Sequence, residues 1–244
     1  DISLQRLKDE FKGGCGNSFI NFVEGMIANS SQKASTLKNH ASTLRCLKKF
    51  KTGTSFKDVD ARYIYEFEQY LYKHCFQPNT IAKHMKHLRT FVNAAIDRCY
   101  IDANNYAFKR YRIRTKESRH HFLHPEELKK LEELELKEKD KRLTKSLDAF
   151  LFCCYTGLRY SDFRSLTEKN LIRRDGKPWI VYSSVKTGAE VKLPITLLFE
   201  GKAYELWKKY KDTLPDFFKL KHNSNVNKDL LKLKKIAKIN THMS

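Results

Sequence analysis

Apolar residues recur every three or four positions through the first hundred residues, which is the period of an α-helix. This pattern predicts helices over 35–50, about 60–74 and 80–100, with Ser35 and Thr36 placed to cap the first of them. Pro78-Asn79-Thr80 separates the second helix from the third. The three stripes consist of Leu37, Ala41, Leu44, Leu47 and Phe50; of Ile64, Phe67 and Leu71; and of Ile81, Met85, Leu88, Val92, Ala95, Ile96 and Tyr100.

The sides of these helices opposite the apolar stripes are basic. Helix 35–50 is expected to expose Lys38, Asn39, Arg45, Lys48 and Lys49, and helix 80–100 to expose Lys83, His84, Lys86, His87, Arg89 and Asn93. Such faces can lie against DNA phosphates. The DNA-binding candidates on them are Lys38, Arg45, Lys83, Lys86, His87 and Arg89.

Residues 104–121 are rich in Lys and Arg but have few regularly spaced apolar positions, which predicts an extended basic linker. Arg112 and Arg114 in this linker are two further DNA-binding candidates. We therefore expect an N-terminal segment (1–16), a helical DNA-binding domain (17–108), a linker (109–121) and a second domain (122–244).

The second domain shows both helical and strand patterns. Pro125 with acidic residues after it predicts a helix start, an apolar helix over 145–156 ends at Gly157, and a short helix follows at 161–166. Alternating residues over 179–185 and 190–195 predict a hairpin around Lys186-Thr187-Gly188. Helices are expected over 202–211 and 227–239, with 223–225 between them as loop and cap residues. The predicted fold class is mainly α with a small β-hairpin or sheet.

The charge of the chain points to a polyanionic partner. Its 244 residues carry 48 Lys and Arg against 28 Asp and Glu, a formal net charge of +20, which is more than solubility requires. The start of the chain does not resemble a signal peptide, and no long uncharged apolar run predicts a membrane span. Six cysteines without a Cys-x-x-Cys pair fit a reducing compartment. A cytoplasmic, nucleoid-associated location is expected.

The sequence contains one cluster of possible metal ligands. His84 and His87 with Cys75 and Cys99 nearby could be scored as ligands, but the sequence offers no second close pair. We therefore expect neither a metal nor another cofactor.

The most specific segment is Tyr155-Thr156-Gly157-Leu158-Arg159-Tyr160-Ser161-Asp162, because an Arg just after a helix-ending Gly is well placed to hold a phosphate. Together with the hairpin turn at Lys186 and Leu193-Pro194-Ile195-Thr196, it resembles the catalytic domain of the tyrosine recombinase, or phage integrase, family. The preceding helices resemble that family's core-binding domain, with 79–80 and 88–96 similar to its DNA-contacting helix. Thr241-His242-Met243-Ser244 is similar to the start of its His-x-x-Arg box.

The resemblance implies a role for each matching residue. Arg159 would bind the scissile phosphate, Lys186 would donate a proton to the leaving group, His242 would complete the phosphate pocket, and Asp162 would support the Arg159 motif. The nucleophile would be a Tyr downstream of the His-x-x-Arg box, beyond Ser244, forming a 3′-phosphotyrosyl bond without metal or nucleotide. Family members integrate or excise mobile elements and assemble as tetramers on paired double-stranded DNA sites, so a homo-oligomer is expected.

Each of these residues also has a simpler interpretation. Arg159 could be a surface Arg in an ion pair, Lys186 a solvated turn residue, Asp162 a helix cap and His242 part of a disordered end. A non-catalytic DNA-binding protein related to recombinases is the alternative function. RNA binding is less consistent with the sequence, because its aromatic residues lie mostly on helical stripes and not on a sheet.

Overall fold

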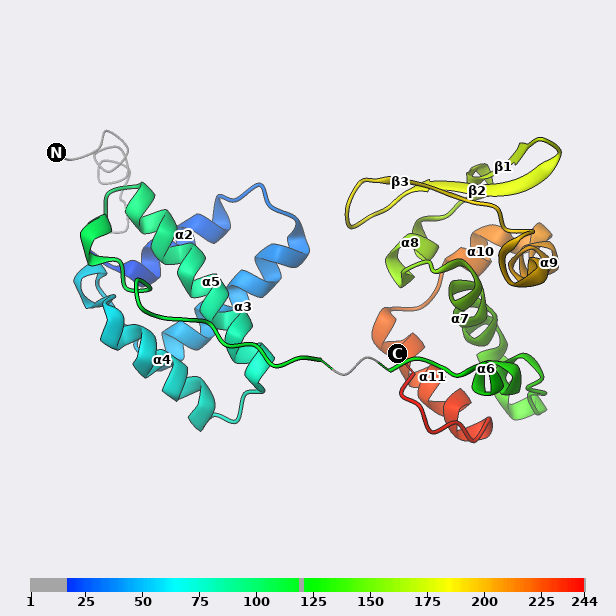
Figure 1. Ribbon diagram of the computed structural model, residues 1–244, viewed down its shortest axis with the longest axis horizontal. Coiled ribbons are helices and arrows are strands. Elements are labelled where there is room, and N and C mark those ends of the chain that lie inside the picture. The colour runs from blue at the N-terminus through cyan, green and yellow to red at the C-terminus, as the bar shows by residue number, and fades with distance from the viewer. Residues whose placement is uncertain (1–16, 119–120, 244) are drawn as a thin grey trace. The chain divides into compact units, whose positions relative to one another are not determined.

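The computed structural model describes residues 17–118 and 121–243, and the chain forms two compact units, residues 1–118 and 119–244 (Figure 1). The division between the units falls inside the predicted linker. The fold is mainly helical with one small antiparallel sheet, as predicted. Among the described residues, no helix is both long enough and apolar enough to cross a membrane.

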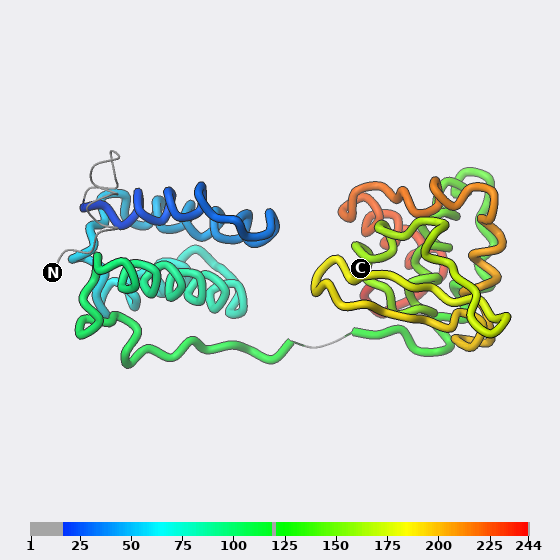
Figure 2. The backbone as a smooth tube through the Cα atoms, turned by 90° about the horizontal axis from the view of Figure 1, so that it is seen from above, coloured from blue at the N-terminus to red at the C-terminus, as the bar shows by residue number. Residues whose placement is uncertain are grey.

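Four α-helices and two short 3-10 helices build the described part of the N-terminal unit, and their apolar stripes enclose one core. Helices α2 and α3 run side by side (Figure 2). Phe19, Leu47, Phe67, Leu88 and Phe91 are among the fully buried side chains of this core. The elements are α2 (Phe19–Ala28), α3 (Ala34–Phe50), η1 (Phe56–Asp58), α4 (Ala61–Lys73), α5 (Pro78–Asp97) and η2 (Ala103–Asn105).

Two details of these helices differ from the sequence-based expectation. Ser35 and Thr36 lie inside α3, whose N-cap is Lys33 and which has no side-chain cap. His84, expected on the outer face of α5, is 2% exposed. Its burial is possible because Thr43 of α3 supplies a polar partner, with 2.8 Å between the Thr43 hydroxyl oxygen and the Nδ1 atom of His84.

The first part of the predicted linker belongs to the N-terminal unit. Ala107, Phe108 and Tyr111 are buried in its core, and the extended segment begins at the last of them, Tyr111. The expectation of a linker from residue 109 missed this packing, because single aromatic residues spaced this way show no helical or strand period. We call the extended residues 111–118 the strap.

The C-terminal unit packs helices against a three-stranded sheet of order β1-β2-β3. Phe152, Phe163, Trp207 and Phe217 lie at the centre of its core. The elements are α6 (Pro125–Glu132), η3 (Glu138–Leu143), α7 (Thr144–Thr156), α8 (Tyr160–Ser165), η4 (Glu168–Asn170), β1 (Leu171–Arg174), β2 (Lys177–Ser183), β3 (Glu190–Leu193), η5 (Leu198–Gly201), α9 (Lys202–Lys209), η6 (Lys211–Thr213), α10 (Leu214–Phe218) and α11 (Asn223–Ile236).

The predicted hairpin is present as β2 and β3, whose last pair before the loop is Ser183 with Glu190. Strand β1, which pairs with β2, was not predicted because most of its residues are exposed and it shows no alternation. Helix α11 begins at Asn223 and not at 227, so the predicted loop at 223–225 is wrong. His222 caps this helix by accepting a hydrogen bond from the Ser224 N–H.

Candidate functional site

The end of α7 sets the position of Arg159. Gly157 adopts the left-handed conformation (φ +69°) that ends α7, and Leu158 is buried directly after it. Arg159 is then the N-cap residue of α8, with its side chain 59% exposed. The backbone of Arg159 is therefore fixed between α7 and α8 while its guanidinium is accessible to solvent, as an anion-binding Arg requires.

Asp162 lies beneath Arg159 in the first turn of α8 and is fully buried. Its Oδ1 atom accepts a hydrogen bond from the backbone N–H of Val185 at 2.9 Å. Its Oδ2 atom faces Nη1 of Arg159 at 3.7 Å and makes no hydrogen bond within the described part of the chain. One buried carboxylate thus contacts both the Arg159 side chain and the residue preceding Lys186.

The β2–β3 loop carries Lys186 at its exposed tip. Backbone hydrogen bonds close the loop, with the Ser184 N–H donating to the Ala189 carbonyl (2.8 Å) and the Gly188 N–H donating to the Ser184 carbonyl (2.7 Å). Gly188 has a φ of +75°, a conformation that favours glycine. The loop is therefore fixed at its base and at Val185, and Lys186 is exposed.

His242 is exposed and lies beside α6. The N–H of Thr241 donates to Oε1 of Glu127 at 3.3 Å, and Met243 is buried in the core of the C-terminal unit. The His242 ring is close to perpendicular to that of His121, with 6.3 Å between their centroids. Direct contacts therefore join Arg159, Asp162 and the Lys186 loop, whereas His242 is positioned by α6 and by Met243.

A cavity of about 440 Å³ adjoins Arg159 between α7 and α11. Cys153 and Cys154 line it, and burial raises the pKa of their thiols to about 12 and about 11. Raised pKa values of this kind keep both thiols protonated at neutral pH and disfavour their use as nucleophiles. Among the described residues, no group of three or more His, Cys, Asp or Glu side chains could hold a metal ion.

The eight DNA-binding candidates differ in their exposure to solvent and in their contacts within the unit. Five of them are exposed, namely Lys38, Arg45, Lys86, Arg112 and Arg114, and Lys83 is half-buried. His87 is half-buried, with its Nδ1 atom 2.8 Å from the Thr43 hydroxyl oxygen, and Nη2 of Arg89 donates to the Tyr111 carbonyl at 3.1 Å. The prediction that His87 and Arg89 point outward is wrong, because both side chains form hydrogen bonds within the N-terminal unit.

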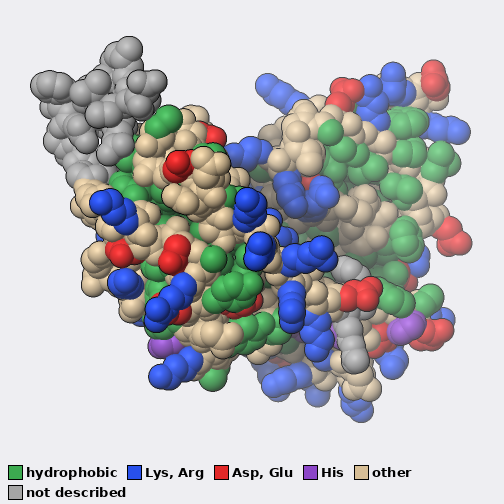
Figure 3. Space-filling model, turned by 60° about the vertical axis from the view of Figure 1, so that its left-hand side comes forward, with side chains coloured by type: hydrophobic (Ala, Val, Ile, Leu, Met, Phe, Trp, Pro, Cys, Tyr) green, Lys and Arg blue, Asp and Glu red, His purple; other side chains and the backbone are tan. Residues whose placement is uncertain are grey.

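Lys and Arg side chains are spread over the face of the molecule shown in Figure 3, with fewer acidic side chains among them. This distribution agrees with the formal charge of +20. A surface of this kind attracts nucleic acid through its phosphates.

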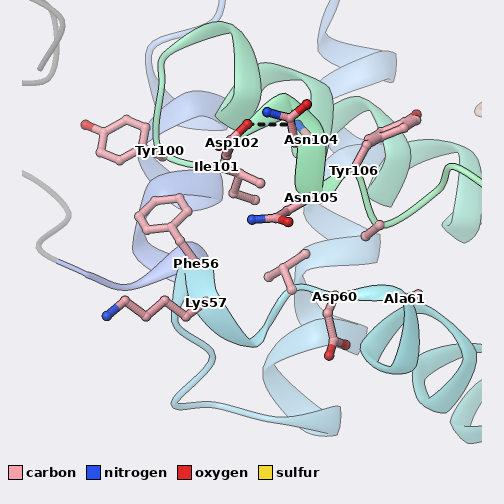
Figure 4. Close-up of a pocket in the computed structure, with 12 residues that line it drawn as sticks. Phe56, Lys57, Asp60, Ala61, Tyr100, Ile101, Asp102, Asn104, Asn105 and Tyr106 are labelled. Atoms are coloured by element: carbon pink, nitrogen blue, oxygen red, sulfur yellow. Dashed lines mark hydrogen bonds between the residues drawn. The ribbon is translucent and has the colours of Figure 1, made fainter. Parts of the chain in front are cut away.

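A second cavity, of about 420 Å³, lies in the N-terminal unit between η1 and η2. Figure 4 shows Phe56 and Tyr100 at one side of it, and their rings stack with 4.6 Å between the centroids. The carboxylates that line it cap helices, since Asp60 accepts from the Tyr63 N–H and Asp102 from the Asn104 N–H. The position of these carboxylates is explained by helix capping and does not indicate a catalytic role.

Sequence reasoning missed two contacts that position the candidate residues. The Val185 N–H that binds Asp162 has no sequence signal, because any residue could supply it. Asn79 was treated as part of a DNA-contacting helix, yet its side chain bonds to the strap. An Asn in the first turn of a helix is a known signal for side-chain to backbone bonding, but its partner 37 residues away could not be predicted.

Residues 18–113 match the family model described as phage integrase SAM-like domain. No curated protein matches the chain significantly. Among solved structures, a lambda integrase tetramer bound to a Holliday junction matches 93% of this chain and 64% of its own, with a TM-score of 0.73 and 16% identity. A lambda integrase dimer bound to a COC′ core site matches 91% and 63%, with a TM-score of 0.72 and 14% identity.

The Tn1549 transposon integrase in complex with circular intermediate DNA matches 80% of this chain and 65% of its own, with a TM-score of 0.59 and 17% identity. The chain thus spans just under two thirds of the integrase chain in each of these three structures. Two compact units with this order of elements define an integrase fold. The chain thus shares its fold with the lambda and Tn1549 integrases, and residues 18–113 match an integrase SAM-like domain, which confirms the resemblance found in the sequence.

Proposed function

We propose that the protein catalyses site-specific DNA recombination that integrates or excises a mobile element, by cleaving and rejoining strands through a 3′-phosphotyrosyl intermediate. The observation that carries this proposal is the Asp162 carboxylate, which contacts both Arg159 and the residue preceding Lys186. It places two exposed cations on segments that one buried side chain fixes relative to each other.

The proposed roles follow from where charge develops during phosphoryl transfer. The transition state spreads negative charge over the nonbridging oxygens, which the bidentate guanidinium of Arg159 suits. The departing 5′ oxygen needs a proton, which the ammonium of Lys186 supplies. His242 would complete the phosphate pocket, and Asp162 would orient Arg159 without contacting the DNA.

The nucleophile in this proposal is a tyrosine encoded downstream of His242. Storing the phosphate bond as a tyrosyl ester lets the 5′ hydroxyl of another strand attack it, so rejoining needs no nucleotide. The cation-bearing chain acts on double-stranded DNA, and we propose that four copies assemble on two paired sites, in line with the tetramer and dimers seen for lambda integrase.

The test uses the full gene product with nicked DNA that carries its crossover sequence. SDS-resistant protein joined to a DNA 3′ end through tyrosine is the expected product. The Lys186→Ala variant should form far less of it, whereas Lys177→Ala, an exposed lysine at the opposite end of β2, should form a normal amount. Salt-sensitive binding of a verified site without any adduct would instead establish a non-catalytic DNA-binding protein.

A further inference from the structure

The strap is tied to α5 at two points. Near its start, the Tyr111 carbonyl accepts a hydrogen bond from Nη2 of Arg89, whose guanidinium also lies over the Phe108 ring, 5.0 Å from its centroid. Near its end, the side chain of Asn79 makes a pair of hydrogen bonds to Lys116. Nδ2 donates to the Lys116 carbonyl at 2.8 Å, and Oδ1 accepts from the Lys116 N–H at 2.8 Å.

The spacing of these two anchors shows that the strap is extended along the helix. Roughly ten residues of α5 separate Arg89 from Asn79, which at 1.5 Å per residue is about 15 Å. About five residues of strap separate Tyr111 from Lys116, which at full extension reach about 17 Å. The strap therefore runs antiparallel to α5 with little slack.

An extended backbone directs alternate side chains to opposite sides. Tyr111 is buried and Ile113 is half-buried, while Arg112 and Arg114 are exposed. The two arginines border a groove of about 420 Å³ whose other wall is α4, including Tyr65 and Tyr72. The anchors thus determine which strap residues face solvent and keep both arginines on one side.

We propose, as an extension of the proposed function, that Asn79 is a positioning residue. It does not contact DNA but clamps the strap so that Arg112 and Arg114 are already positioned to bind the phosphates of the DNA backbone. Without the clamp the strap is held near Tyr111 and by the packing of Ile113, so the segment from Arg114 onward must be ordered when DNA binds. Preordering of this kind lowers the entropic cost of binding.

The sharpest test uses Asn79→Asp and Asn79→Ala in the protein as it exists. Asn79 lies in the first turn of α5, where an acidic residue favours the helix through the dipole. An aspartate keeps the acceptor for the Lys116 N–H but sets a carboxylate oxygen against the Lys116 carbonyl. Asn79→Asp should therefore raise or preserve the thermal stability of the N-terminal unit while releasing the strap, a combination that a purely structural role would not produce.

Amide hydrogen exchange across 112–118, without DNA, measures release directly. Asn79→Ala removes both hydrogen bonds to Lys116 and should make exchange at Lys116 about five- to thirty-fold faster. Asn79→Asp keeps an acceptor for the Lys116 N–H, so its exchange should be faster by a smaller factor. Asn21→Ala, which replaces an exposed Asn on α2, should leave it unchanged. Unchanged exchange in both Asn79 variants would overturn the clamp.

DNA binding measured against salt concentration tests the second half of the proposal. If neither arginine reaches its phosphate, the slope of log affinity against log salt should fall by up to about two in both variants. Faster exchange with an unchanged slope would overturn the positioning role. Absence of salt-sensitive binding in the unaltered protein would instead contradict the proposed function, and exchange at Lys116 would still decide the clamp.

Discussion

Substitution of Asp162 offers a quantitative test of how the C-terminal unit holds its candidate site together. The side chain is fully buried and its Oδ1 atom receives the Val185 N–H. Asp162→Ala removes a hydrogen bond to a charged acceptor and leaves a small void, which together should cost about 2–3 kcal/mol of unfolding free energy. Of a total that is commonly about 5–15 kcal/mol for a domain, this is a large fraction.

Asp162→Asn should cost much less. The amide oxygen can still accept from Val185, and the lost attraction to Arg159 is small because the two groups are 3.7 Å apart and the Arg side chain is 59% exposed. Pairs of this kind contribute about 0–1 kcal/mol. The Asn variant should therefore stay within about 1 kcal/mol of the unaltered protein.

The assay can be confined to the relevant unit, since both tryptophans, Trp179 and Trp207, lie in the C-terminal unit. Urea unfolding followed by tryptophan fluorescence reports the free energy of that unit, and the N-terminal unit contributes none of the signal. Equal losses of stability in the Ala and Asn variants, or no loss in Ala, would refute the view that the Asp162–Val185 hydrogen bond holds the loop.

Three further predictions concern other parts of the chain. Burial lowers the pKa of both His84 and His87 from 6.5 to about 4. Their neutral rings therefore stabilise the N-terminal unit fully above pH 6.5, and this stabilisation should be lost as pH falls toward 4. Denaturation followed by helical circular dichroism should show the loss of stability, and His84→Leu should show less of it. Gly157→Ala should destabilise the C-terminal unit by about 1–2 kcal/mol. The cost comes from the positive φ alone, because an added Cβ meets no atom within 4 Å, and an unchanged free energy in urea unfolding would contradict it. Replacing Lys83 and Lys86 by Ala should weaken DNA binding and lower the salt slope by about one for each of the two lysines that binds a phosphate, whereas an unchanged slope would exclude both from the interface.

The helical stripes and the Gly157 helix end could be predicted because they depend on local periodicity and on one residue's backbone preference. His84 could not be placed correctly, since its burial depends on Thr43, which lies 41 residues earlier on another helix. Strand β1 carries exposed Ile172 and Arg173 and is defined only by pairing with β2. Long-range partners of this kind leave no local pattern.

The candidate site shows the same division. Arg159 and Lys186 were found through the order and spacing of short motifs, each with a glycine that fixes the local turn. The contact that relates the two segments is a bond between the Asp162 side chain and the Val185 backbone, which no residue type at position 185 could have indicated. Asn79 was predicted only as part of a segment similar to a DNA-contacting helix, and the hydrogen bonds of its amide to the strap had no sequence signal.

In the proposed mechanism Arg159 stabilises the phosphate while Lys186 protonates the leaving 5′ oxygen. It is tested most directly with DNA whose scissile 5′ bridging oxygen is replaced by sulfur, because a thiolate leaves without a proton. This substrate should restore cleavage by full-length Lys186→Ala to near the unaltered rate but should not restore cleavage by Arg159→Ala. Restoration of neither variant, or of both to the same degree, would contradict this division of roles.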